Sequence, residues 1–148
     1  MSAIEARLRE LGIALPPAPA PVANYLGTKR SGDLVFVSGR VSDLQGEVGS
    51  DVTADEARAA ARATMLLLLA IIRRDLGSLD RIASIERVQG FVRAARTFTA
   101  LPQVVDGASD LLVELLGENG RHARTATGAG QLPYGAAIQL DLVARLEA

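Results

Sequence analysis

The sequence predicts a two-layer α+β domain in which two long helices cover one face of a mixed β-sheet. Two segments carry most of this prediction. Residues 104–116 place apolar side chains at helical spacing, and residues 138–146 alternate between two faces, which is typical of a strand with one buried face. The length of 148 residues and the hydrophobic content of 49% fit a single domain with one core.

The first 24 residues differ in pattern from the rest of the chain. Residues 2–11 place Ile4, Leu8 and Leu11 at helical spacing, and Gly12 is a stop signal. The prolines that follow predict an extended connector; they are Pro16, Pro17, Pro19 and Pro21. We therefore predict a lead helix and a proline-rich strap over residues 1–24 and one domain over residues 25–148.

The first strand is predicted at residues 34–38, a β-rich run that follows a Gly-Asp turn signal and ends at Gly39. A short partner strand is expected on the side of residues 25–29. Residues 41–48 are expected to form a loop or a weak hairpin arm.

A capping-box pattern from Thr53 to Glu56 starts a helix that continues to about Leu76, with Gly77 as its C-cap. The apolar stretch 65–69 within this helix is assigned to the core. Residues 82–93 then fit a strand, and Gly90 is predicted to be a bulge in it.

The helix over residues 104–116 ends at Gly117, and it is followed by a short small-residue segment at 123–128, a turn at 132–135 and the last strand. This order gives two strand–helix–strand crossovers, which place both long helices on the same sheet face. The uncovered face is expected to carry Val35, Val37 and Val143. Such an apolar face favours burial in a homo-oligomer.

Composition excludes several classes of function. A net charge of −1 and an aromatic content of 3% disfavour nucleic acid and anionic membranes as partners. The chain has no cysteine and one histidine, so thiolate chemistry and a metal site with two histidines from one chain are excluded. His122 is expected to be a surface residue. No targeting segment or membrane span is recognised, so a cytoplasmic location is expected.

Three short motifs resemble the C-terminal signature of the RidA/YjgF family: Ala-Arg-Thr-Ala at 123–126, Leu-Pro at 132–133 and Ile-Gln-Leu at 138–140. Residues 34–39 are similar to its N-terminal strand. Residues 19–25, 106–110 and 120–124 resemble a longer branch that carries a lead segment. The resemblance covers about residues 16–147.

The resemblance implies a chorismate-mutase-like homotrimer with ligand sites in the clefts between subunits. It also implies hydrolysis of reactive enamines and imines to 2-oxo acids and ammonia, without a cofactor or a metal. The implied ligand is a small carboxylate or imino acid. Other members are described as endoribonucleases or translation inhibitors.

The family's site residues carry over position by position. Arg124 matches the arginine that grips the substrate carboxylate, Gly39 the glycine whose N–H assists, and Ser38 the serine before it; Tyr25 matches the tyrosine that closes the pocket. Arg40 stands where the family usually has glutamine, and it adds a second cation.

A second departure concerns the proton acceptor. Gln139 replaces the family's glutamate fifteen residues after the arginine, and an amide can hold water but cannot accept its proton near neutral pH. Asp141 lies on the same strand face and could supply a base, although pairing with an arginine is the favoured role for it.

Two functional classes remain open. The first is an imine/enamine hydrolase in which Arg124 and the Gly39 amide position the acid for attack by water. The second is a trimeric protein that binds small carboxylates without turnover. Gln139 favours the second class or a specialised reaction. RNA cleavage is disfavoured, because the chain lacks a basic surface and a histidine pair.

Overall fold

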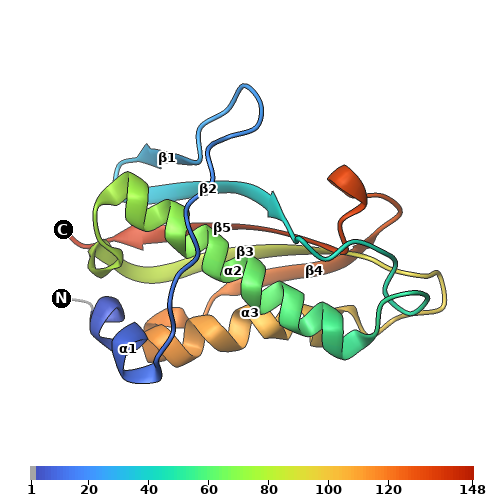
Figure 1. The fold of residues 1–148 in the computed structure, drawn as a ribbon. Coiled ribbons are helices and arrows are strands. Elements are labelled where there is room, and N and C mark those ends of the chain that lie inside the picture. Colours follow the sequence, from blue (N-terminus) through green and yellow to red (C-terminus); the bar gives the residue numbers. More distant parts are fainter. Residues whose placement is uncertain (1–2) are drawn as a thin grey trace.

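A computed structural model of the chain describes residues 3–148 and shows one five-stranded sheet with two long helices against one face (Figure 1). The helices and strands are α1 (Ile4–Leu11), β1 (Thr28–Ser31), β2 (Leu34–Val41), α2 (Ala54–Leu76), β3 (Ile82–Arg93), α3 (Leu101–Leu116), β4 (Ala123–Ala129) and β5 (Ile138–Leu146). Short 3-10 turns lie at η1 (Leu79–Arg81), η2 (Gly117–Gly120) and η3 (Pro133–Gly135). The predicted α+β class and element order are confirmed.

The strands lie in the order β1-β2-β5-β3-β4. β3 and β4 are parallel, and the other neighbouring pairs are antiparallel. The sheet is therefore mixed, as predicted, and its two edges are β1 and β4.

The two long helices begin and end close to where the sequence predicts. Thr53 Oγ1 accepts a hydrogen bond from the Glu56 backbone N–H (3.1 Å), and Glu56 Oε1 accepts one from the Thr53 N–H (3.2 Å), which closes the capping box of α2. α3 begins three residues earlier than predicted. Pro102 lies in its first turn, where a missing N–H costs no hydrogen bond.

Gly90 is not a bulge, and that prediction is wrong. It pairs regularly with Leu140 and Ala126, and the irregularities of β3 lie earlier, between residues 82 and 87. A Cβ at Gly90 would lie 2.7 Å from Val105 Cγ1. Glycine is needed here because α3 packs directly on the strand.

The composition predicted for the uncovered face is also partly wrong. Val35 and Val37 pair with Ala144 and Leu142, and all four side chains are buried in the core. The intervening Phe36, which is 45% exposed, lies on the uncovered face opposite Val143. Alternate residues of a strand face opposite sides of the sheet, but a continuous run of apolar residues does not reveal which alternate set faces the helices.

β2 does not end at Gly39 but continues to Val41 through an irregularity. Its pairing with β5 changes register between Val37 and Arg40, so the strand ladder is interrupted there as at a β-bulge. The partner strand exists as β1, a few residues later than predicted.

The lead helix α1 packs against the main core. Ile4 and Leu8 are buried in the same cluster as the sheet and the long helices. Glu5 accepts two hydrogen bonds from Arg73 (3.0 and 2.6 Å) and one from the Leu79 N–H (3.1 Å), and the Arg73 bonds lower the pKa of Glu5. Residue 2, where the helix was predicted to start, lies outside the described residues. No helix in residues 3–148 is long and apolar enough to cross a membrane.

Candidate functional site

Four of the six site residues implied by the resemblance meet in one pocket of about 260 Å³. Its walls come from the strap, the irregular end of β2, the start of β5 and the η3 turn. We call it the Gln139 pocket; its lining residues are Val22, Tyr25, Gly39, Arg40, Val41, Pro133, Tyr134 and Gln139.

The bulge in β2 explains how Gly39 and Gln139 come together. Because the register changes there, Gly39 is exposed and lies against the side chain of Gln139. A Cβ at Gly39 would lie 3.3 Å from Gln139 Nε2, which is tight contact. A glycine at this point keeps the space in front of the amide open.

Arg40 and Tyr25 form the polar side of the pocket. Arg40 Nη1 donates to the Tyr25 hydroxyl oxygen (2.9 Å) and to the carbonyl of Ala20 (3.5 Å). The guanidinium thus ties the strap to β2. A cation and a phenol on one wall suit a small anionic ligand.

Ser38 does not line the pocket. Its hydroxyl donates to the carbonyl of Leu26 (2.5 Å), and its backbone N–H donates to the carbonyl of Gly27 (3.0 Å). Its observed role is to fix the segment that follows Tyr25.

Tyr134 is a lining residue that sequence analysis missed, since the segment was assigned only as a turn. Its side chain is 73% exposed, and its φ of 59° is unusual for a residue other than glycine. Gln45 Nε2 donates to its carbonyl (2.7 Å), which holds the turn in place. A strained aromatic residue at a pocket mouth is typical of functional sites.

Arg124 lies away from this pocket. It pairs with the buried Val88, so its side chain is on the helix-covered face. Its Nη1 donates to Asp106 Oδ1 (2.6 Å) and Ser109 Oγ (3.1 Å), and its Nη2 donates to the Pro102 carbonyl (3.4 Å).

The sheet register gives the separation between Arg124 and Gln139. Gln139 pairs with Phe91, which pairs with Thr127, three residues beyond Arg124 on β4. Two strand spacings across and three residues along place the two Cα atoms about 14 Å apart. Because their side chains also lie on opposite faces, one chain alone does not bring them together.

His122 is half-buried, so the prediction of a surface histidine is wrong. Its Nε2 is 2.9 Å from Ser109 Oγ and its Nδ1 is 2.7 Å from the carbonyl oxygen of Gly120. Burial lowers the pKa of His122, and the charge of Arg124 lowers it further. Its spacing of two residues from Arg124 was the available signal for their association.

Asp141 lies on the same face as Gln139, two residues further along β5, and is half-buried. Burial raises the pKa of its carboxyl group, against the opposing effect of Arg87. The amide of Gln89, in the orientation that satisfies its partners, donates to Asp141 Oδ1 (3.3 Å) and accepts from Arg87 (3.0 Å). The expected link to an arginine is therefore indirect.

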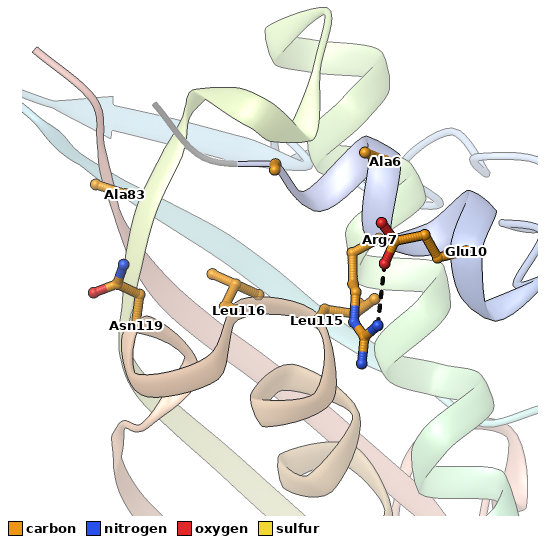
Figure 2. Close-up of a pocket in the computed structure, with 8 residues that line it drawn as sticks. Ala6, Arg7, Glu10, Ala83, Leu115, Leu116 and Asn119 are labelled. Carbon is orange, nitrogen blue, oxygen red and sulfur yellow. Dashed lines mark hydrogen bonds and ion pairs between the residues drawn. The ribbon is translucent and has the colours of Figure 1, made fainter.

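Two further hollows lie on the helix side. One of about 330 Å³, shown in Figure 2, lies between α1 and the end of α3, and its charged residues Arg7 and Glu10 already pair with each other at 3.1 Å. The other, about 850 Å³, is lined by Leu66 and Leu67 among others, so the stretch 65–69 is only partly core. Within residues 3–148, no cluster of three histidine, aspartate or glutamate side chains is placed to hold a metal.

Comparison with known proteins decides the family. A family model described as "YjgF/chorismate mutase-like, putative endoribonuclease" matches residues 5–146. The chain belongs to the YjgF/chorismate mutase-like family. It is also 39% identical to Protein TCP17 of Trypanosoma cruzi over 150 residues, covering 97% of this chain and 94% of that protein.

Solved structures confirm the chorismate-mutase-like fold of this YjgF-family chain. A Shewanella oneidensis MR-1 protein described as "a putative endoribonuclease" is 32% identical, with a TM-score of 0.93 over 98% of this chain and 100% of that one. A protein of unknown function from Agrobacterium tumefaciens is 37% identical, with a TM-score of 0.89 over 97% and 92%. Escherichia coli TdcF, solved with bound serine, shares the fold at 18% identity and a TM-score of 0.62, over 88% of this chain and 94% of that one.

Proposed function

We propose that this YjgF-family chain forms a homotrimer whose sites lie between subunits, and that these sites hydrolyse reactive imines and enamines to 2-oxo acids and ammonia. The observation that carries the proposal is the separation of Arg124 from the Gln139 pocket. The Arg124 and Gln139 Cα atoms are about 14 Å apart and their side chains lie on opposite sheet faces, so Arg124 can serve this pocket only from a neighbouring subunit.

The exposed apolar surface supports assembly at this pocket. Val22 and Tyr134 line the pocket and are 65% and 73% exposed, and Leu26, next to Tyr25, is 62% exposed. Phe36 adds an aromatic ring to the uncovered sheet face. Large apolar side chains grouped in this way are typical of surfaces that another subunit covers. β1 and β4 are the edge strands of the sheet, and in the proposed assembly a neighbouring subunit pairs with or covers their free backbone groups.

The reaction follows from the groups in such a cleft. Arg124 of one subunit holds the ligand carboxylate while the imine carbon lies over the pocket of the next. Water adds to that carbon while one of its protons passes to the nitrogen, which gives a carbinolamine. The remaining hydroxyl proton then passes to the nitrogen as the carbon–nitrogen bond breaks, and the products are a 2-oxo acid and ammonia. Arg40 and Tyr25 add donors that orient the ligand.

Gln139 limits the rate of this reaction. Its amide oxygen can accept a hydrogen bond from the attacking water, but the amide cannot take the proton. The general-base contribution, typically about 10²–10⁴-fold, is therefore missing from this position. We expect slow turnover of simple imino acids rather than none, because an iminium carbon is itself strongly electrophilic.

The test is ammonia release from imino acids generated in place by an amino-acid oxidase, with catalase present to remove peroxide. Buffer without the protein measures spontaneous hydrolysis. The expected result is acceleration by the wild-type chain that Arg124→Ala removes. The hydrolase proposal is contradicted if neither the wild type nor Gln139→Glu accelerates release above buffer.

Gln139 also favours a second candidate, a trimer that binds small carboxylates without turnover. That function predicts saturable binding of a 2-oxo acid such as pyruvate, which needs Arg124, together with no ammonia release above buffer. The serine bound by TdcF is of similar size and also carries a carboxylate. Ribonuclease activity has no such support, since the single histidine is engaged inside the subunit.

A further inference from the structure

Four polar side chains between α3 and β4 form a continuous hydrogen-bonded chain. Asp106 and Ser109, three residues apart, share one face of α3, and both accept from Arg124 Nη1 (2.6 and 3.1 Å). Ser109 Oγ in turn lies 2.9 Å from His122 Nε2. We call Asp106, Ser109, His122 and Arg124 the Arg124 cluster.

The backbone fixes the direction of the hydrogen bonds. His122 Nδ1 lies 2.7 Å from the Gly120 carbonyl oxygen, which can only accept, so Nδ1 carries the proton. In the neutral ring Nε2 must then accept, and Ser109 must donate its hydroxyl proton to it. This leaves the lone pairs of Ser109 Oγ directed to Arg124. Burial, which lowers the pKa of His122, favours the neutral ring that this arrangement needs.

These contacts use one side of the guanidinium. Both Nη1 hydrogens are taken by Asp106 and Ser109, and Pro102 takes one Nη2 hydrogen. Among residues 3–148, the Nε–H and the second Nη2–H remain for a ligand. The Nε–Nη2 edge of a guanidinium is a fork of donors whose geometry matches a carboxylate.

We propose that Asp106, Ser109 and His122 are positioning residues that hold Arg124 so that its Nε–Nη2 edge is presented to the ligand carboxylate. The inference rests on the proposed function, because it assumes that Arg124 meets a carboxylate. Asp106 fixes the far side of the guanidinium, and Ser109 stops it from rotating. His122 fixes the hydroxyl of Ser109.

A competing interpretation makes the opposite prediction. If Asp106 only occupies Arg124 in place of a ligand, its removal frees the guanidinium and tightens binding. If Asp106 positions Arg124, its removal weakens binding, and asparagine, which keeps an oxygen acceptor, preserves it. The sign of the change therefore separates the two.

The first experiment measures the affinity for pyruvate by isothermal titration at neutral pH. Asp106→Ala should raise the Kd at least about tenfold, as for loss of a hydrogen bond to a charged group, and Ser109→Ala about three- to tenfold. Asp106→Asn should stay within about threefold of wild type. Asp110→Ala is the matched control, because Asp110 lies one turn further along α3 and pairs with Arg58 rather than Arg124.

The second experiment needs no ligand. The chain has one histidine, so the ¹⁵N signals of its imidazole belong to His122 without ambiguity. We expect the tautomer with the proton on Nδ1, and Ser109→Ala should raise the pKa of His122 because the neutral ring loses its donor. Asp110→Ala should change neither. A proton on Nε2 overturns the assigned direction of the hydrogen bond between Ser109 and His122, and with it the role given to His122.

The outcomes separate failure of the inference from failure of the proposed function. If wild type does not bind pyruvate or other small carboxylates, the proposed function fails. If wild type binds but Asp106→Ala and Ser109→Ala bind equally well or better, with unchanged oligomer mass, the positioning role is overturned. If Asp106→Ala does not fold, the decision rests on Ser109→Ala, with Asp106→Asn as the variant expected to bind like wild type. A Kd of Ser109→Ala equal to that of wild type and of Asp106→Asn then overturns the positioning role.

Discussion

The Gln139 pocket and the Arg124 cluster are built in different ways. The pocket forms where regular structure breaks, at the β2 bulge and at the left-handed Tyr134 of η3. The Arg124 cluster forms on regular elements, from residues three apart on α3 and two apart at the start of β4. The pocket is concave and rimmed with exposed apolar side chains, whereas the cluster is held together by its own hydrogen bonds.

The difference shows how one site can be divided over a fold. In the proposed function, the cluster supplies the carboxylate anchor, and the pocket supplies a cavity that lacks this anchor. Each supplies what the other lacks, and the sheet places them on opposite faces, with β3 between β4, which carries Arg124, and β5, which carries Gln139. In the proposed function, assembly of subunits is the step that joins them.

The largest change is expected from restoring a proton acceptor to the pocket. Gln139→Glu should raise the rate of imine hydrolysis by about 10²-fold or more, the usual contribution of a general base. The two side chains are nearly isosteric, and Arg40 on the same wall favours the ionised carboxylate. Steady-state ammonia release measures the change. An unchanged rate with ligand binding intact would show that the pocket has diverged at more than this residue.

Removal of the anchor tests the other region. Arg124→Ala should weaken carboxylate binding by about 2–5 kcal/mol if the guanidinium pairs with the ligand in a desolvated cleft. Arg121→Ala is the control, since Arg121 is exposed and its ion pair among residues 3–148 is with Glu118. Titration with pyruvate measures both. Equal affinity for the Arg124→Ala variant and wild type would remove Arg124 from the site.

A smaller effect is expected from narrowing the pocket. Gly39→Ala places a methyl group 3.3 Å from Gln139 Nε2, so the amide must move or the ligand must lose space. Affinity should fall by about 1 kcal/mol, at the low end of the cost of overpacking. Gly130→Ala, where a methyl group meets nothing within 4 Å, is the control. Equal losses in both variants would indicate a general effect on folding.

The last effect is the pH dependence of stability that His122 contributes. The folded state holds its pKa below the ordinary value, so the unfolded chain binds the proton first as the pH falls. The free energy of unfolding should therefore decrease below about pH 6.5, by at most about 1.4 kcal/mol per pH unit. His122→Gln should remove this slope between pH 5 and 7, measured by urea denaturation. An identical slope in the variant would contradict the burial of His122.

Elements with strong periodicity or explicit end signals are the ones that local sequence patterns predict. The bounds of β5 and the capping box of α2 are confirmed, because both depend on neighbours in the chain. Gly90 was misassigned because its requirement comes from Val105 on α3, which no local pattern reveals. Val35 and Val37 were wrongly assigned to the uncovered face, where Phe36 lies, because the position of the helices relative to β2 is likewise not visible in a local pattern.

The site was predicted unevenly for a related reason. Gly39, Arg40 and Gln139 were recognised through motif resemblance, and the structure places them in one pocket. The partners of Arg124 were missed, since Asp106 and Ser109 have an ordinary helical spacing and His122 stands alone as the only histidine. Only packing of α3 on β4 turns these residues into one cluster.

The division of the site between subunits is tested most directly by the mass of the protein in solution. Light scattering at micromolar concentration should give three times the 15.5 kDa mass of the chain. A mass of one chain would contradict the account, because Arg124 and the Gln139 pocket, on opposite faces of one sheet, could then never bind the same small molecule.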